Sequence, residues 1–186
     1  MRAGRDLAGL ALVAAASAAC PGQALAGDSA TAAGRVGASV IEPLTLTAIE
    51  PLRFGVMAVS ETESGAITVD PDTGSSIISG GLGSLCPSGA SCFARPALFG
   101  VAGEAGRHYR IEAPASAIAQ HEGGSAPALA VSAIRVSASG GSGGAVRRML
   151  DDGGNDSFRL GGTLVIPAGS APGMYRAELS VVVSYD

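Results

Sequence analysis

Residues able to perform chemistry are few in this chain and poorly placed. Ser142 sits in a run of glycines at residues 140–144, which formally matches the elbow that exposes the nucleophilic serine of some hydrolases. A glycine run satisfies that pattern by composition, and no histidine follows the serine, whereas that fold puts the histidine last in chain order. We expect His108 and His121 to be surface residues without a catalytic partner. The sequence therefore predicts that the protein is not an enzyme.

A group of oxygen-bearing side chains could in principle bind a metal. Asp151, Asp152, Asn155 and Asp156 cluster around two glycines, and calcium prefers oxygen ligands. Their spacing lacks the alternate ligands and the closing glutamate of the twelve-residue calcium loop. We expect a solvated acidic turn here, with neither a metal nor another cofactor.

The cysteines favour a disulfide. Five residues separate Cys86 from Cys92, more than the two to four usual between zinc ligands. An even pair in an exported protein predicts a disulfide, which would close a small loop within residues 80–92. Cys20 could instead mark a lipoprotein, but the leucine expected three residues before it is missing.

The first 26 residues predict a signal peptide. Arg2 and Arg5 form a basic start, residues 7–19 are apolar, and residues 24–26 offer the small side chains that a signal peptidase reads. The apolar run is shorter than the roughly 20 residues of a spanning helix. We expect export to the periplasm, cell surface or medium without membrane insertion, and a mature start at Gly27.

The remaining chain is the size of one domain. The whole sequence of 186 residues carries 12 basic and 16 acidic residues, a formal net charge of −4, so nothing attracts nucleic acid. Short apolar runs separated by Gly, Pro, Asp and Ser predict an all-β fold. The expected strands are residues 36–48, 65–70, 94–101, 109–113, 129–137, 160–167 and 175–185.

About seven strands predict a β-sandwich spanning residues 41–186. Turn chemistry is expected at residues 70–74, Asp-Pro-Asp-Thr-Gly, and at Pro172-Gly173. Residues 137–158 predict a long surface loop, with one helical turn at residues 146–150; such loops are either functional or mobile. The inward-facing core positions are expected to include Phe54, Phe99, Leu164 and Leu179.

Both ends of the predicted mature chain alternate in hydrophobicity. Apolar groups occupy every second position from Tyr175 to Tyr185, so one face of that strand needs a core, and we expect its missing neighbour to come from earlier in the chain or from another molecule. Small apolar residues alternate along residues 27–40, here called the arm. A free arm of this kind can fill a groove in another subunit's sandwich. The alternative is a frayed, alanine-rich terminus.

Several short motifs, in order, resemble a family of bacterial pilin-like secreted proteins. They are Pro43-Leu44, Pro51-Leu52-Arg53-Phe54-Gly55, Gly65-Ala66-Ile67-Thr68-Val69, Phe99-Gly100-Val101-Ala102-Gly103, Tyr109-Arg110-Ile111, Leu160-Gly161-Gly162-Thr163-Leu164, Gly173-Met174-Tyr175 and Val181-Val182-Val183-Ser184-Tyr185. The family is domain of unknown function 4402, and the chain is more distantly similar to chaperone-usher fimbrial subunits and spore-coat U proteins. Tyr185 is penultimate and Gly173 fourteenth from the end, as in fimbrial subunits.

The resemblance implies an immunoglobulin-like (pilin-like) sandwich and a final strand that a periplasmic chaperone pairs with, in a system that includes an outer-membrane usher. Fimbrial disulfides usually bridge separate strands, whereas Cys86 and Cys92 can close only a local loop.

We therefore expect a secreted, non-enzymatic structural or adhesive surface subunit that self-associates by strand exchange. The arm of one copy would add to the edge beside residues 175–185 of the next. The predicted subunit-binding residues are Val36, Ala38, Val40, Gly173, Tyr175, Leu179, Val181, Val183 and Tyr185. The alternative is a self-complete, monomeric periplasmic module that binds a ligand or carbohydrate through residues 137–158. The chain has no Trp and only three Tyr, which disfavours a sugar site because such sites use aromatic rings on which the sugar stacks.

Overall fold

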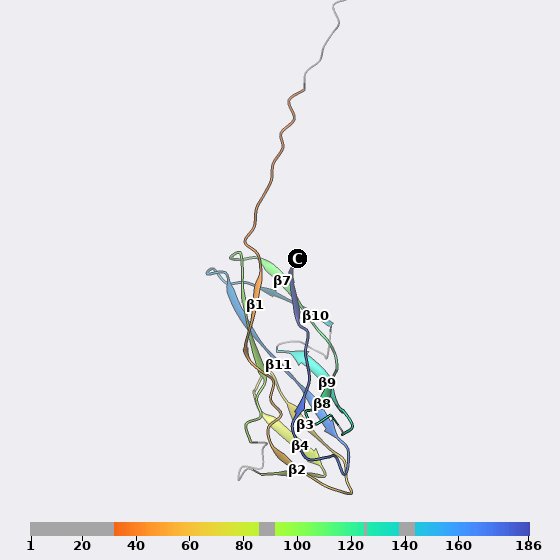
Figure 1. Ribbon diagram of the computed structural model, residues 1–186. Coiled ribbons are helices and arrows are strands. Elements are labelled where there is room, and N and C mark those ends of the chain that lie inside the picture. Colours follow the sequence, from red (N-terminus) through yellow and green to blue (C-terminus); the bar gives the residue numbers. More distant parts are fainter. Residues whose placement is uncertain (1–31, 86–91, 125, 138–143) are drawn as a thin grey trace, which may run out of the picture. The chain divides into compact units, whose positions relative to one another are not determined.

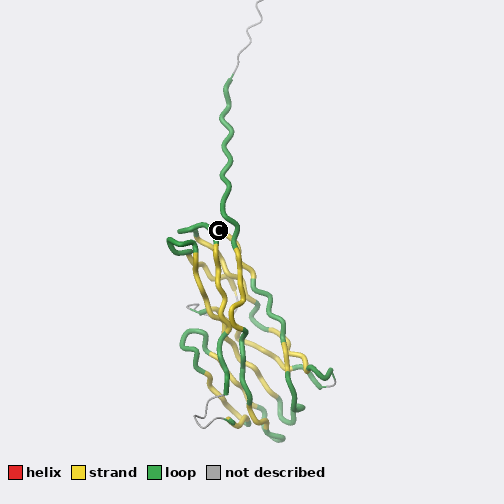
Figure 2. Tube along the Cα trace, turned by 60° about the vertical axis from the view of Figure 1, so that its left-hand side comes forward, coloured by secondary structure: helices red, strands yellow, loops and turns green. Residues whose placement is uncertain are grey.

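The computed structural model describes residues 32–85, 92–124, 126–137 and 144–186. Every regular element in this described part is a β-strand (Figures 1 and 2), so the predicted all-β class is confirmed, and no helix there could cross a membrane. The strands are β1 (Thr45–Glu50), β2 (Met57–Val59), β3 (Gly65–Val69), β4 (Ser76–Gly80), β5 (Leu82–Ser84), β6 (Ala97–Ala102), β7 (His108–Ala113), β8 (Ala117–His121), β9 (Leu129–Val136), β10 (Gly144–Met149), β11 (Asn155–Ile166), β12 (Tyr175–Arg176) and β13 (Val182–Tyr185).

The chain divides into two units, residues 1–38 and residues 39–186. The described residues of the first unit, 32–38, form no strand and are exposed to solvent. The thirteen strands of the described residues all belong to the second unit. The two units are treated separately below.

An eight-stranded antiparallel sheet is built around β11, the longest strand. One edge of β11 pairs with β6 through its first half and with β3 through its second half, and the other edge pairs with β9. Beyond these neighbours, β1 flanks β6, β4 flanks β3, and β8 followed by β12 extends from β9. Two smaller sheets complete the unit, with strand orders β10-β7-β13 and β2-β5.

The three-stranded sheet forms a second layer over one part of the large sheet, which makes the fold a β-sandwich. Tyr109 and Ile111 of β7 alternate with exposed residues and pack against Val101 and Phe158 of the large sheet. With Val136 and Leu150, these residues form what we call the closed core, and each is at most 2% exposed. Period-two alternation on β7 thus places one face inward and one face in water.

A second cluster, here called the open core, lies over the rest of the large sheet. Its buried members include Ile67, Leu129, Ile134 and Leu160. Its outer neighbours are only partly buried; they are Leu52, Phe54, Met57, Ile78, Ala94, Phe99, Ala113, Ala117, Tyr175, Leu179 and Val181. The predicted core residues Phe54, Phe99 and Leu179 therefore face inward without being fully covered, while Leu164 is 7% exposed.

Five predicted strands are confirmed: β3, β6, β7 and β9 with small shifts in their ends, and β11, which begins at Asn155 rather than at Leu160. The other five short strands, β2, β4, β5, β8 and β10, raise the number above the predicted seven. The predicted turn at residues 70–74 is also confirmed, because the Gly74 amide donates to Asp70 O at 2.9 Å and the Asp72 amide to Asp70 Oδ1 at 2.7 Å.

Three sequence predictions are wrong. The strand expected at residues 36–48 starts only at Thr45, since residues 36–44 pair with no strand in the described part. The long loop at residues 137–158 contains β10 and the start of β11, and the helical turn at residues 146–150 is strand, because β10 pairs with β7 throughout. The strand expected at residues 175–185 is interrupted, because β12 pairs with β8 and β13 with β7, in different sheets.

Candidate functional site: an apolar groove

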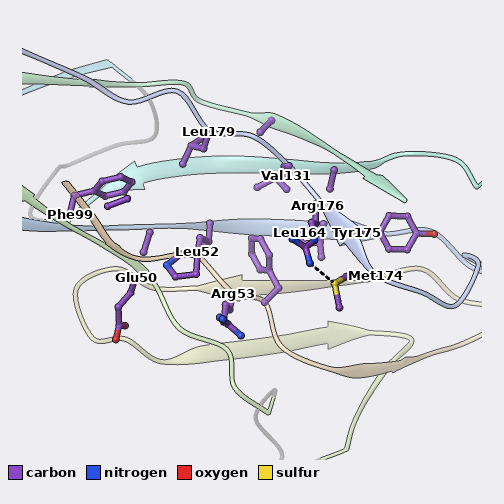
Figure 3. Close-up of a pocket in the computed structure, with 17 residues that line it drawn as sticks. Glu50, Leu52, Arg53, Phe99, Val131, Leu164, Met174, Tyr175, Arg176 and Leu179 are labelled. Carbon is purple, nitrogen blue, oxygen red and sulfur yellow. Dashed lines mark hydrogen bonds between the residues drawn. The ribbon is translucent and has the colours of Figure 1, made fainter. Parts of the chain in front are cut away.

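An apolar groove opens onto the open core between two chain segments, residues 48–54 and residues 174–179 (Figure 3). Its volume is about 550 Å³. The large sheet supplies its floor from β6, β8, β9 and β11, through Ala97, Phe99, Ala117, Ala119, Val131 and Leu164. Leu52 comes from one wall, and Tyr175 and Leu179 come from the other (Figure 3).

A second cavity of about 1220 Å³ continues the groove between residues 52–61 and residues 169–175. The two cavities share lining residues on both walls and on the floor, among them Phe54, Leu164 and Tyr175, so they form one continuous groove. Phe93 lines the second cavity and is 80% exposed, although a large aromatic side chain gains most when it is buried.

The groove exists because the second layer of the sandwich ends early. The sheet β10-β7-β13 covers the closed core, but the open core is bordered on that side by segments such as residues 177–181, which belong to no strand. The floor is also low, since Ala97, Ala117 and Ala119 occupy inward-facing positions where a larger side chain would fill the space.

Unpaired backbone flanks the groove on both sides. Among the described residues, β1 pairs only with β6, so its other edge is free. On the opposite wall, residues 177–181 pair with no described strand. Free N–H and C=O groups in a row form a template for another strand.

Charged groups lie on the rim of the groove rather than in it. Glu50 contacts Arg95 at 3.5 Å, and Arg176 of β12 pairs with Glu122, which directly follows β8. Arg53 is exposed on the rim. Within the described ranges, no three metal-ligating side chains gather anywhere. The arrangement suits the binding of an apolar chain.

A network of ionisable side chains borders the closed core. The Tyr109 hydroxyl donates to Asp156 Oδ2 at 2.8 Å, and Arg148 donates to both Asp156 oxygens at 2.6 and 2.8 Å. Burial and the neighbouring Asp156 raise the pKa of Tyr109 well above its ordinary value of 10. Burial alone would raise the pKa of Asp156, but hydrogen bonds from Arg148 and Tyr109 outweigh it and hold that pKa below 3.8. This network is a structural tie between β7, β10 and β11.

The structure brings some predicted subunit-binding residues to the groove and places others elsewhere. Tyr175 and Leu179 line it. Val181 packs between the two cores, while Val183 and Tyr185 pack against the closed core.

Gly173 lies at the turn before β12 with φ +148°, and its backbone approaches His121 so closely that any side chain there would collide with the imidazole.

The arm residues contact little. Val36 is 99% and Val40 95% exposed, and Ala38 is exposed as well. Cys92 forms an isolated bridge with Val56. Cys86, Ser142 and the predicted signal peptide lie outside the described residues, so the disulfide and the export signal stay predictions.

The small residues of the groove floor were missed by the sequence predictions, although Phe99 and Leu164 of the same floor were predicted as inward-facing core positions. Ala97, Ala117 and Ala119 look unremarkable in an alanine-rich chain, and Ala117 and Ala119 belong to a strand that was not predicted. The usable signal was a set of small residues on inward positions of two strands of the same sheet, β6 and β8, which indicates space above the sheet.

Comparison with known proteins identifies the family. The model of the family described as Domain of unknown function (DUF4402) matches residues 44–185. The chain belongs to this family. No curated protein and no solved structure matches the chain. The DUF4402 match covers every described strand and both walls of the groove, and the predicted relationship to this family is confirmed.

Proposed function

We propose that this DUF4402 protein is an exported, non-enzymatic structural or adhesive surface subunit whose copies join by β-strand addition. The observation that carries the proposal is the groove, in which a partly covered apolar core lies between two free backbone edges. A strand laid there would gain main-chain hydrogen bonds and would bury alternate side chains in the core. It would also cover an edge that otherwise invites aggregation.

The occupant we propose is the arm of a second copy. Small apolar residues alternate along residues 30–40, and Val36 and Val40 are almost fully exposed, so they gain by burial elsewhere. An extended segment of this length spans about 36 Å at about 3.3 Å per residue. It has as many residues as the wall formed by residues 169–179.

The same proposal explains why a dedicated partner would be needed before assembly. A subunit with an empty groove exposes Phe99, Leu179 and other core side chains, which a periplasmic chaperone would cover until an outer-membrane usher brings two copies together. In this view the sandwich is immunoglobulin-like and lacks one strand, and the protein acts in the periplasm and at the cell surface.

The test uses the mature chain from Gly27 and two matched double variants, examined by analytical ultracentrifugation. Val36→Asp with Val40→Asp puts two charges on the face of the arm that would enter the groove, where an unpaired charge is too costly to bury. Ala33→Asp with Ser39→Asp adds the same charge to the other face. We expect the wild type and the second variant to form oligomers and the first to stay monomeric.

A wild-type chain that remains a stable monomer would overturn the proposal and favour the self-complete binding module. Oligomers that persist in the Val36→Asp, Val40→Asp variant would show that another surface joins the copies.

A further inference from the structure

Tyr185 joins parts of the chain that are far apart in sequence. Its hydroxyl donates to Glu42 O at 2.7 Å and accepts a hydrogen bond from the Glu104 amide at 2.7 Å. Glu42 precedes β1, and Glu104 lies in the turn between β6 and β7. One hydroxyl group therefore ties β13 both to the segment that leads into β1 and to the turn that connects the large sheet with the three-stranded sheet.

The surroundings of this hydroxyl leave it little freedom. Gly103 lies against it, and a Cβ at that position would collide with the Tyr185 oxygen. The guanidinium carbon of Arg107 sits 5.7 Å from the centre of the Tyr185 ring, within the range of a cation–π contact. The ring packs beside Leu44 against the closed core. A tyrosine fits here because the ring fills an apolar site and the hydroxyl reaches two backbone groups.

The hydrogen bond from Tyr185 to Glu42 holds the stretch of chain that connects the arm with β1. Among the described residues, it is the one hydrogen bond in which residues 32–44 take part outside the β1 ladder. Residues 32–40 are the described part of the arm, and residues 41–44, here called the root, connect it with β1. Tyr185 belongs to the same C-terminal segment that supplies Tyr175 and Leu179 to the groove wall.

We propose that Tyr185 is a positioning residue that clamps the root of the arm to the C-terminal strand. This clamp rests on the strand-addition function proposed above. In that function a copy donates its arm from the root and receives the next copy's arm at the wall formed by its own C-terminal segment. The clamp connects these two places within one copy. It fixes the point from which the arm leaves the subunit and limits bending between successive copies.

The first test compares Tyr185→Phe with Tyr175→Phe by hydrogen exchange on the full mature chain. Each variant loses one hydroxyl, but the Tyr175 hydroxyl donates locally to Ala171 O at 3.0 Å, away from the arm. Because the Glu104 amide loses its acceptor and the released root lets the start of β1 fray, we expect amide exchange at Glu104 and at residues 45–47 to become roughly 3- to 10-fold faster in Tyr185→Phe alone. Unchanged exchange at these amides in Tyr185→Phe overturns the clamp.

A second readout separates the clamp from the proposed function and from a purely structural role. In electron micrographs of oligomers, Tyr185→Phe should widen the distribution of angles between neighbouring copies while leaving their number per oligomer unchanged. An unchanged angular distribution overturns the positioning role. If the wild type forms no oligomers, the strand-addition function fails, and the exchange experiment still decides the clamp.

Discussion

The two cores of the sandwich rest on the same large sheet and differ in what covers them. Above the closed core, β7 and its neighbours supply Tyr109 and Ile111, and Phe158 beneath them is 1% exposed. Above the open core, residues 51–54 and 177–181, which lie outside the named strands, leave Phe99 partly accessible, although its ring stacks on that of Phe158 with the ring centres 5.2 Å apart. Two adjacent phenylalanines on neighbouring strands thus experience different amounts of burial.

This difference indicates that the open core is unfinished rather than poorly packed. Its buried members, such as Ile67 and Ile134, are fully enclosed, and most of its partly exposed members, Phe99 and Leu179 among them, line the groove. The inner face of the large sheet is apolar throughout, but the second layer covers only part of it. The remaining part lacks cover. One added strand would supply that cover.

The largest expected effect is on the closed core. Phe158→Ala should lower the free energy of unfolding by about 3–5 kcal/mol, the range for truncating a buried aromatic residue. Phe99→Ala, beside it in the groove, should cost only about 1.5–3 kcal/mol because its side chain is partly solvated already. Urea unfolding of the monomer measures both. Equal losses would show that the two cores are equally well covered.

The next effect concerns the polar tie in the closed core. Asp156→Asn leaves Arg148 without its carboxylate partner, and we expect a loss of about 2 kcal/mol at pH 7. The pKa of Asp156 in the folded protein lies below its ordinary value of 3.8, so its contribution is present above about pH 4 and is lost as the pH falls through the folded-state value.

Urea unfolding between pH 3 and 7 tests this. The gap in stability between wild type and Asp156→Asn should narrow only at the acidic end. A gap that stays constant down to pH 3 would contradict the role given to the carboxylate.

The sequence predicted the strands whose apolar side chains alternate clearly and missed those built from small or charged residues. Residues 65–69 and 129–136 have branched apolar side chains at inward positions and were found. Gly144–Met149 carries two adjacent arginines, so its strand character depends on pairing with β7, which no local pattern reveals.

At residues 36–40 the local pattern was present but misleading, because alternating side chains alone do not make a strand. A strand needs a partner, and among the described residues these have none. The groove was only partly predictable: alternation at Leu179 and Phe54 shows which side faces inward, but whether anything covers that side depends on the whole topology.

The smallest expected effect comes from a substitution that fills the groove with a larger side chain. Ala117 lines its floor, whereas Ile118 on the same strand is 58% exposed on the opposite face of the sheet. Ala117→Phe should stabilise the monomer by about 1 kcal/mol, because the new ring covers apolar surface that water now reaches. Ile118→Phe should change stability little. A loss of stability in Ala117→Phe, as in an overpacked core, would show that the groove has no room.

The most direct measurement asks whether the groove accepts a strand. The full mature chain carrying Val36→Asp and Val40→Asp, labelled with nitrogen-15, is titrated with a peptide of the wild-type arm, residues 27–40, and followed by amide chemical shifts. We predict that shifts concentrate at residues 48–54 and 174–181, and that amides of residues 177–181 become protected from exchange as they acquire a partner strand. Shifts confined to the outer face around Ile118, or no shifts at saturating peptide, would contradict strand addition.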